Sequence, residues 1–147
     1  MIQRIQTLFI LVAAILTALM LRTEFAEVAS GGDYYIFSAE GITSGETVLF
    51  NGLPVKVFIG LITVLHLVII FLFKKRIIQI RLLAFTIILL IGLSGLLLYF
   101  LYAGFENIDV VFKIPMVIPL MAVILDYLAI RAIGKDEALV RSINRIR

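Results

Sequence analysis

The sequence contains no cysteine, no tryptophan and a single histidine, and only 16% of its 147 residues are charged. The absence of cysteine excludes disulfide bonds, thiol redox chemistry and cysteine metal sites. One histidine also excludes a bis-histidine haem within this chain. These absences argue against two common roles of small membrane proteins, thiol–quinone redox chemistry and b-type haem ligation, unless a partner supplies the ligands.

Apolar residues, in contrast, make up 63% of the chain, and the mean hydropathy is +1.16. A soluble domain is nearer half apolar and a quarter charged, so long uncharged runs place this chain in the membrane class. We predict an all-α membrane protein, a bundle of four transmembrane helices in a single domain. The predicted spans cover residues 5–21, 55–73, 82–103 and 114–130.

A basic segment, residues 74–81, separates the second span from the third and predicts the orientation. It contains Lys74, Lys75, Arg76 and Arg81 and no acidic residue. Lys and Arg concentrate in short cytoplasmic loops and can contact lipid headgroups, so we expect this inner hinge and both termini in the cytoplasm. The segments assigned to that side carry ten basic and two acidic residues, whereas the outer segments carry three basic and seven acidic residues.

The first apolar run allows an alternative. Its basic start and the small residues Val28, Ala29 and Ser30 are compatible with a cleavable signal peptide. The interval between the run and this site is long, however, and includes Arg22, Glu24 and Glu27. We therefore interpret residues 5–21 as a retained span.

The outer loop, residues 22–54, holds most of the polar sequence between spans. Strand-forming residues at 34–37 and 47–50, separated by glycines, predict a small β-hairpin-like layer. Exposed aromatic residues among acidic ones are typical of a partner surface, which would include Tyr34, Tyr35 and Phe37. The same side chains can instead cover the underside of the hairpin itself.

The C-terminal segment, residues 131–147, follows a helical pattern after Gly134. Apolar residues recur at helical spacing with arginines between them, which predicts an amphipathic cytoplasmic tail on the inner leaflet. Its arginines, Arg141, Arg145 and Arg147, would then contact anionic lipid headgroups. A frayed basic tail is the alternative, since a short isolated helix is marginally stable.

Two ionisable residues, His66 and Asp126, lie inside predicted spans. Each is 11 or 12 residues from the outer end of its span, which places both about 16–18 Å from the outer face. Such residues face the bundle interior by default, so they can form a pair that carries a proton. They can equally form an interhelical hydrogen bond that fixes packing, or Asp126 can reach Arg131 and water.

The two ends of the chain, residues 1–16 and 129–147, resemble a family of bacterial four-span membrane proteins known only as a domain of unknown function. This resemblance implies a bacterial inner (cytoplasmic) membrane location and no particular activity. The plan of four spans with a β-layer after the first is also similar in shape to claudin-like proteins. The first loop lacks the tryptophans and cysteines that mark that group.

No cluster of residues has metal-ligand spacing, no glycine-rich loop follows a strand, and no nucleophile lies near a base. We therefore predict no metal, no cofactor and no nucleic-acid partner. The favoured function is an accessory subunit that contacts other membrane proteins and the lipid bilayer. The alternative is a minimal transporter or membrane enzyme that uses His66 and Asp126.

Overall fold

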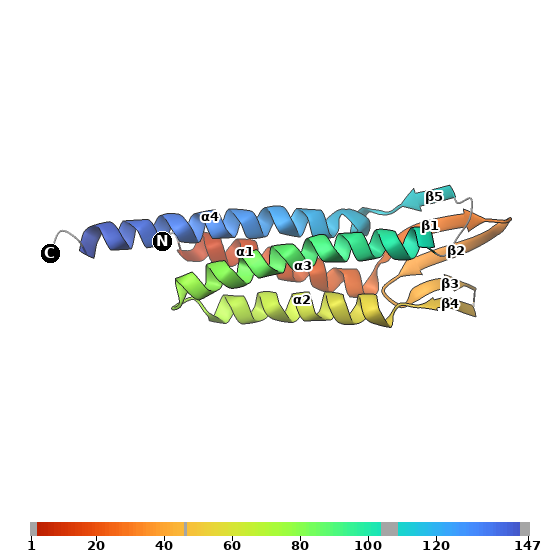
Figure 1. The fold of residues 1–147 in the computed structure, drawn as a ribbon, viewed down its shortest axis with the longest axis horizontal. Helices are drawn as coiled ribbons and strands as arrows, with labels where there is room; N and C mark the ends of the chain where they lie inside the picture. The colour runs from red at the N-terminus through yellow and green to blue at the C-terminus, as the bar shows by residue number, and fades with distance from the viewer. Residues whose placement is uncertain (1–2, 46, 104–108, 145–147) are drawn as a thin grey trace.

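The computed structural model describes residues 3–45, 47–103 and 109–144 and contains both helices and a sheet (Figure 1). Each of the four long helices is long and apolar enough to cross a membrane, which confirms that part of the prediction. The helices are α1 (Gln3–Leu19), α2 (Leu53–Phe71), α3 (Arg76–Ala103) and α4 (Ile118–Asn144). Two short 3-10 helices, η1 (Met20–Arg22) and η2 (Ile114–Val117), lie at the end of α1 and the start of α4.

The all-α prediction is wrong, because the extramembrane segments form a five-stranded antiparallel sheet. The order across the sheet is β4-β3-β2-β1-β5. The strands are β1 (Glu24–Ser30), β2 (Asp33–Ser38), β3 (Gly41–Ser44), β4 (Thr47–Asn51) and β5 (Asp109–Phe112). The predicted strands at 34–37 and 47–50 correspond to β2 and β4. They do not pair with each other as a hairpin would, because β3 lies between them.

The strand β5 comes from the loop between α3 and α4 and pairs with β1 across more than 80 residues of sequence. Its pairing aligns Ala26 with Phe112 and Ala29 with Asp109. Lys113, directly after β5, bonds to both Glu24 and Glu27 of β1, with Nζ 2.7 Å from the Glu27 Oε1. Hydrogen bonds from Lys113 to these two carboxylates raise the pKa of its ammonium group above the ordinary value. This ion pair holds the end of β5 against β1.

Glycines make two of the strand connections possible. Gly31 and Gly32 both adopt positive φ in the turn between β1 and β2. At Gly41, φ is 125° and a Cβ would lie 1.9 Å from the carbonyl oxygen of Phe50. Any side chain at residue 41 would therefore separate β3 from β4.

The helices pack side by side, with α1 and α3 each contacting both α2 and α4. Consequently α2 and α4 face each other diagonally across the core. Alanines at Ala13, Ala122 and Ala129 are fully buried, which lets the helices approach closely. The core continues from the helices into the sheet, where Phe25 and Phe37 meet edge-to-face with ring centroids 5.4 Å apart. The sheet thus covers one end of the helices as part of the same core.

The C-terminal segment is helical up to Asn144, as the amphipathic-tail prediction expected. It is not a separate element, however, because α4 continues through Gly134 to Asn144 as one helix. Figure 1 shows it extending beyond the start of α1. Its extension is held by protein contacts: Gln6 donates a 2.6 Å hydrogen bond to Asp136, and Arg76 lies 3.9 Å from Glu137. The inner hinge is correspondingly shorter than predicted, since α2 ends at Phe71 and α3 already begins at Arg76.

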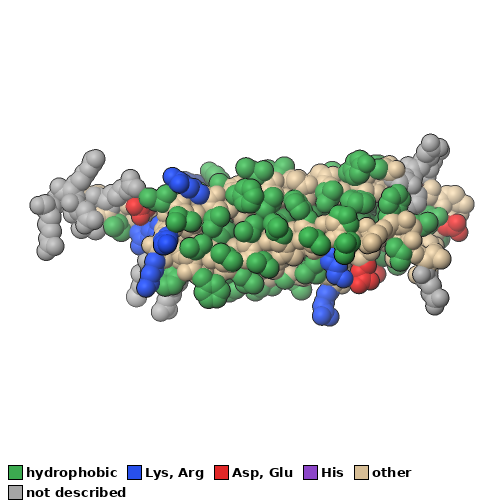
Figure 2. All heavy atoms as spheres, turned by 60° about the horizontal axis from the view of Figure 1, so that its bottom comes forward, with side chains coloured by type: hydrophobic (Ala, Val, Ile, Leu, Met, Phe, Trp, Pro, Cys, Tyr) green, Lys and Arg blue, Asp and Glu red, His purple; other side chains and the backbone are tan. Residues whose placement is uncertain are grey.

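Charged and apolar side chains are separated along the molecule. In Figure 2, apolar side chains cover the helices, and lysines and arginines gather towards their two ends. Large residues in the middle of the helices, such as Ile88, Ile91 and Ile124, are exposed. An apolar surface of this kind is stable in lipid and is not expected in water.

Candidate functional site: a buried histidine–aspartate pair

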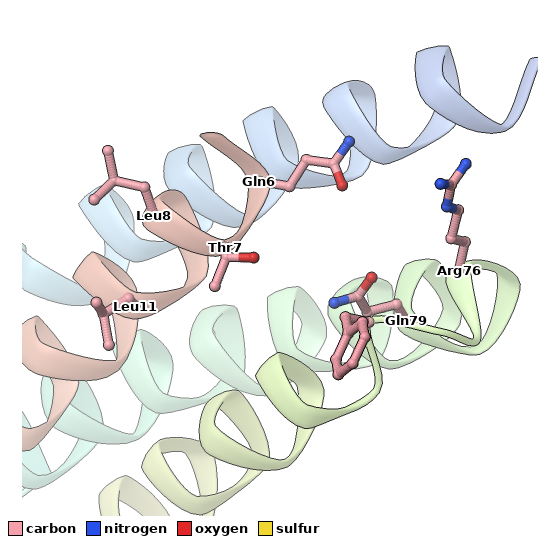
Figure 3. A pocket seen from close by; sticks show the side chains of 7 residues that line it. Gln6, Thr7, Leu8, Leu11, Arg76 and Gln79 are labelled. Atoms are coloured by element: carbon pink, nitrogen blue, oxygen red, sulfur yellow. The ribbon is translucent and has the colours of Figure 1, made fainter. Parts of the chain in front are cut away.

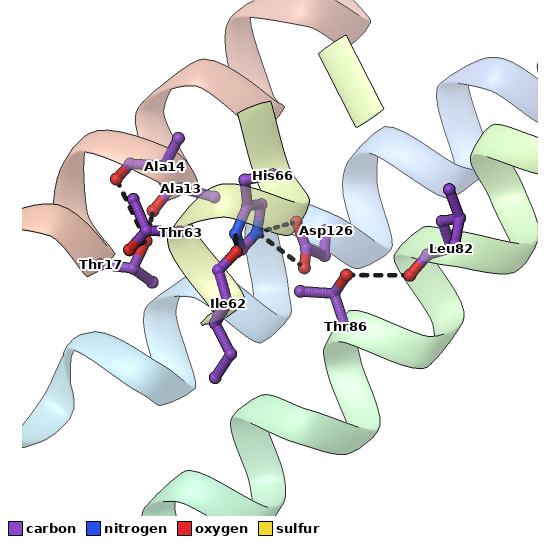
Figure 4. A network of polar contacts seen from close by, with 9 residues as sticks. All are labelled: Ala13, Ala14, Thr17, Ile62, Thr63, His66, Leu82, Thr86 and Asp126. Carbon is purple, nitrogen blue, oxygen red and sulfur yellow. Dashed lines mark hydrogen bonds and ion pairs between the residues drawn. The ribbon is translucent and has the colours of Figure 1, made fainter. Parts of the chain in front are cut away.

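His66 of α2 and Asp126 of α4 meet in the centre of the helices. Both side chains are fully buried, and the His66 Nε2 lies 3.1 and 3.2 Å from the two carboxylate oxygens of Asp126 (Figure 4). Because α2 and α4 are diagonal neighbours, this contact crosses the core. The two residues, which the sequence predicts at similar depth in their spans, are therefore in direct contact. The side chain of Asp126 points towards His66 inside the core.

The second ring nitrogen of His66 determines how many protons the pair holds. Nδ1 lies 2.9 Å from the carbonyl oxygen of Ile62, which can only accept, so Nδ1 carries a hydrogen. Nε2 and the carboxylate then need one further proton between them, because two bare lone pairs would repel each other. That proton resides on His66 or on Asp126, and the pair has no net charge in either case. A neutral pair is far less costly in an apolar core than either ion alone.

Three threonines lie near the pair, Thr17 and Thr63 on one side and Thr86 on the other (Figure 4). The Oγ1 atoms of Thr17 and Thr63 are 3.2 Å apart, and each hydroxyl also donates to a backbone carbonyl of its own helix. Thr86 donates to the carbonyl oxygen of Leu82. No buried side-chain nitrogen or oxygen in the described part of the chain lacks a hydrogen-bond partner.

This geometry supports two kinds of chemistry. The pair can hold α2 against α4. If the helices separated, His66 and Asp126 would lose the hydrogen bond between their side chains. It can also hold a proton that shifts between Nε2 and the carboxylate. Neither residue lines any of the three pockets described for the surface of this protein. Within the described residues, no three His, Asp or Glu side chains gather as metal ligands would.

Comparison with known proteins identifies the family. The family model described as a domain of unknown function, DUF4293, matches residues 2–146. The chain belongs to this family. The match confirms the resemblance found at the two chain ends. Neither the curated proteins nor the solved structures gave a match. The family description itself names no activity.

The predicted partner surface is divided by the sheet. Tyr34 is exposed near the tip of β2, whereas Tyr35 is partly buried against the core. Phe37 is only 1% exposed and packs on Phe25, so its side chain is not available to a partner. Alternate residues of a strand point to opposite faces, and the sheet packs one of these faces against the helices.

The basic residues predicted to contact lipid lie at the end of the helices opposite the sheet. Lys74, Lys75 and Arg81 are exposed, and Arg76 is partly buried. The Lys74 Nζ lies 5.9 Å from the centroid of the Phe73 ring. Arg141 belongs to α4, but its side chain lies outside the description, as do Arg145 and Arg147 entirely.

Sequence reasoning missed a second polar cluster at this end. Gln6 and Gln79 are both buried, the first bonded to Asp136 and the second donating to the carbonyl oxygen of Ile69 at 3.0 Å. The sequence did contain a signal for this cluster, because Gln6 and Gln79 are polar residues within apolar segments. Their inward orientation, and the pairing of Asp136 with a residue 130 positions away, depend on the tertiary structure.

Proposed function

We propose that this protein is a small bacterial inner-membrane protein that serves as an accessory, interacting subunit of a larger membrane assembly. The proposed orientation places the termini and the α2–α3 turn in the cytoplasm and the sheet outside. The charge distribution supports this orientation, because the end of the helices away from the sheet carries Lys74, Lys75, Arg76 and Arg81.

The observation that carries the interaction role is the edge strand β4. All five of its residues are exposed, and they include Val48, Leu49 and Phe50, with Val48 61% exposed. No described strand pairs with the outer side of β4. Soluble edge strands are normally protected by lysine, proline, a bulge or a covering element. The strand β4 contains neither lysine nor proline, and a register shift against β3 leaves Leu49 as an extra residue in β4. An exposed edge with apolar side chains and no lysine or proline can still pair with a strand of another protein.

The test is photo-crosslinking from β4 in intact cells. A photoreactive residue at position 49 should give one dominant adduct with another envelope protein, and the wild-type chain should co-purify with that same protein. Reciprocal purification from the partner identifies it independently. Val48→Lys should abolish both results, because a lysine on an edge strand disfavours pairing.

The matched control is Val111→Lys on β5, the opposite edge, where the valine is 63% exposed. This variant should keep the adduct and the co-purification. Equal loss in both variants, or an isolated monodisperse protein with no adduct from β4, would contradict the proposal. Adducts between two copies of this chain would replace it with self-association.

The second candidate function, a minimal transporter or membrane enzyme, is favoured by one observation, the fully buried His66–Asp126 pair. Asp126→Asn separates the two functions. It should abolish a proton-dependent activity in a cell-based assay while leaving accumulation unchanged, whereas an interacting subunit should tolerate it.

A further inference from the structure

A pocket of about 390 Å³ opens beside the start of α1, where α2 turns into α3 (Figure 3). This is the end of the helices opposite the sheet (Figure 1). The wall combines polar and apolar side chains in one cavity. It is lined by Gln6, Thr7, Leu8, Leu11, Phe73, Arg76 and Gln79.

The polar side of the pocket is held in place by the protein. Gln6 is oriented by Asp136 and Gln79 by the carbonyl oxygen of Ile69, and both glutamines are buried. One hydrogen bond does not exhaust an amide group, which has two N–H donors and a carbonyl oxygen. Arg76 contributes the only charge among the lining residues. The pocket therefore presents a guanidinium group beside oriented amides. Glu137 of α4 also lies 3.9 Å from this guanidinium group, so a bound phosphate would share Arg76 with that carboxylate.

Two of the apolar side chains, Leu8 and Leu11, lie deeper along α1 than Gln6, whereas Phe73 lies in the turn between α2 and α3. Leu11 is five residues beyond Gln6 in α1, about 8 Å further from the end of the helix. Leu8, Leu11 and Phe73 are all exposed on the lateral surface. A molecule in the pocket thus meets the polar groups and Phe73 at the end of the helices, and Leu8 and Leu11 further in, which is compatible with a phospholipid whose acyl chain runs along α1.

We propose that this pocket binds one anionic phospholipid, with the phosphate on the Arg76 guanidinium and an acyl chain along Leu8, Leu11 and Phe73. A guanidinium group binds phosphate through two parallel hydrogen bonds, which favours this headgroup chemistry. Lys74 and Lys75 in the adjacent turn add positive potential and favour a net negative lipid over a zwitterionic one. The inference rests on the membrane placement proposed above, but not on any protein partner.

Native mass spectrometry of the full-length protein in mild detergent tests the proposal. The probes are phosphatidylglycerol and phosphatidylethanolamine with identical acyl chains, each added alone. Both contain phosphate, but the ammonium group of phosphatidylethanolamine cancels its charge. We expect one tightly bound phosphatidylglycerol per chain, at several-fold higher occupancy than phosphatidylethanolamine. Equal occupancy of the two lipids would overturn the proposal.

Arg76→Gln should weaken phosphatidylglycerol binding about tenfold, the loss expected for a hydrogen bond to a charged group. The matched control is Arg81→Gln, which removes the same charge from the same helix at an exposed residue outside the pocket. It should change binding less than twofold. Equal effects of the two variants would overturn the site and leave only general attraction of lipid to positive charge.

Two further arms keep the result interpretable. An excess of inorganic phosphate should not displace the lipid, because free phosphate makes no contact with Leu8, Leu11 or Phe73. Displacement would reassign the pocket to a soluble phosphate compound and overturn the lipid proposal. If Arg76→Gln does not fold, Arg76→Lys keeps the charge and should still weaken binding, since it loses the second hydrogen bond. Binding unchanged in Arg76→Lys would overturn the role assigned to the guanidinium group.

Discussion

A buried histidine beside a buried aspartate is stable in an apolar core only as a unit. The bond from Nδ1 of His66 to the Ile62 carbonyl fixes the ring, and the single proton shared with Asp126 leaves the pair neutral. At the residue scale, the two side chains therefore depend on each other more than on any other neighbour.

We predict that His66→Leu destabilises the protein by about 1–2 kcal/mol, because Asp126 then lacks its partner. Asp126→Leu should cost a similar amount. The double variant His66→Leu with Asp126→Leu should recover part of the loss, since two apolar side chains need no hydrogen bond. Unfolding in detergent, followed by circular dichroism, measures this cycle.

Asp126→Asn serves as the conservative control. An asparagine amide can donate to Nε2 of a neutral His66, so its stability should stay within about 0.5 kcal/mol of the wild type. Additive losses in the double variant would show that the two residues are energetically independent, despite the 3.1 Å contact.

At the scale of elements, α4 differs most from its predicted span. The prediction ended the span at residue 130, whereas the helix continues to Asn144. Gly134 lies inside it, and a Cβ at this residue would meet nothing within 4 Å. The contacts of Asp136 with Gln6 and of Glu137 with Arg76 hold the following turn against α1 and α3. The helix is thus maintained by tertiary contacts across a residue of low helix propensity.

We predict that Gly134→Ala stabilises the protein by about 0.5–1 kcal/mol, because alanine restricts the unfolded chain and fits the helix without contact. Thermal unfolding in detergent measures the change. The comparison variant is Gly41→Ala, which should be strongly destabilising because its Cβ would collide with the Phe50 carbonyl. Destabilisation by Gly134→Ala would argue that the helix does not continue through this residue.

At the scale of the whole molecule, the first and the last long helix have their outer ends on the same side of the fold. Figure 1 shows the start of α1 and the end of α4 at the end of the helices opposite the sheet. Basic residues gather at that end, whereas Glu24, Glu27 and Asp33 belong to the sheet. These basic and acidic residues are therefore separated in space, at opposite ends of the folded molecule, as well as along the sequence.

We predict that reporter fusions after residue 78 and at the C-terminus act in the cytoplasm, whereas a fusion after residue 40 acts outside the membrane. A reporter pair with opposite requirements, one active only in the cytoplasm and one active only outside, provides an internal control. Any fusion reporting the opposite side would reverse the orientation and move the sheet into the cytoplasm.

The sequence by itself determined the four apolar helices, because a helix satisfies its backbone hydrogen bonds within one continuous segment. It also predicted that His66 and Asp126 lie at similar depth, since a helix rises by a constant distance per residue. Their direct contact depends on the diagonal arrangement of α2 and α4.

Only the tertiary structure decided the strand pairing and extent of the sheet, and the inner end of the helices. The strand β5 has four residues and no clear alternation, and it becomes a strand through its pairing with β1. Likewise, Phe37 became a core residue because β2 turns it towards Phe25. Strand pairing satisfies hydrogen bonds between distant segments, so the residues of one segment do not specify it alone.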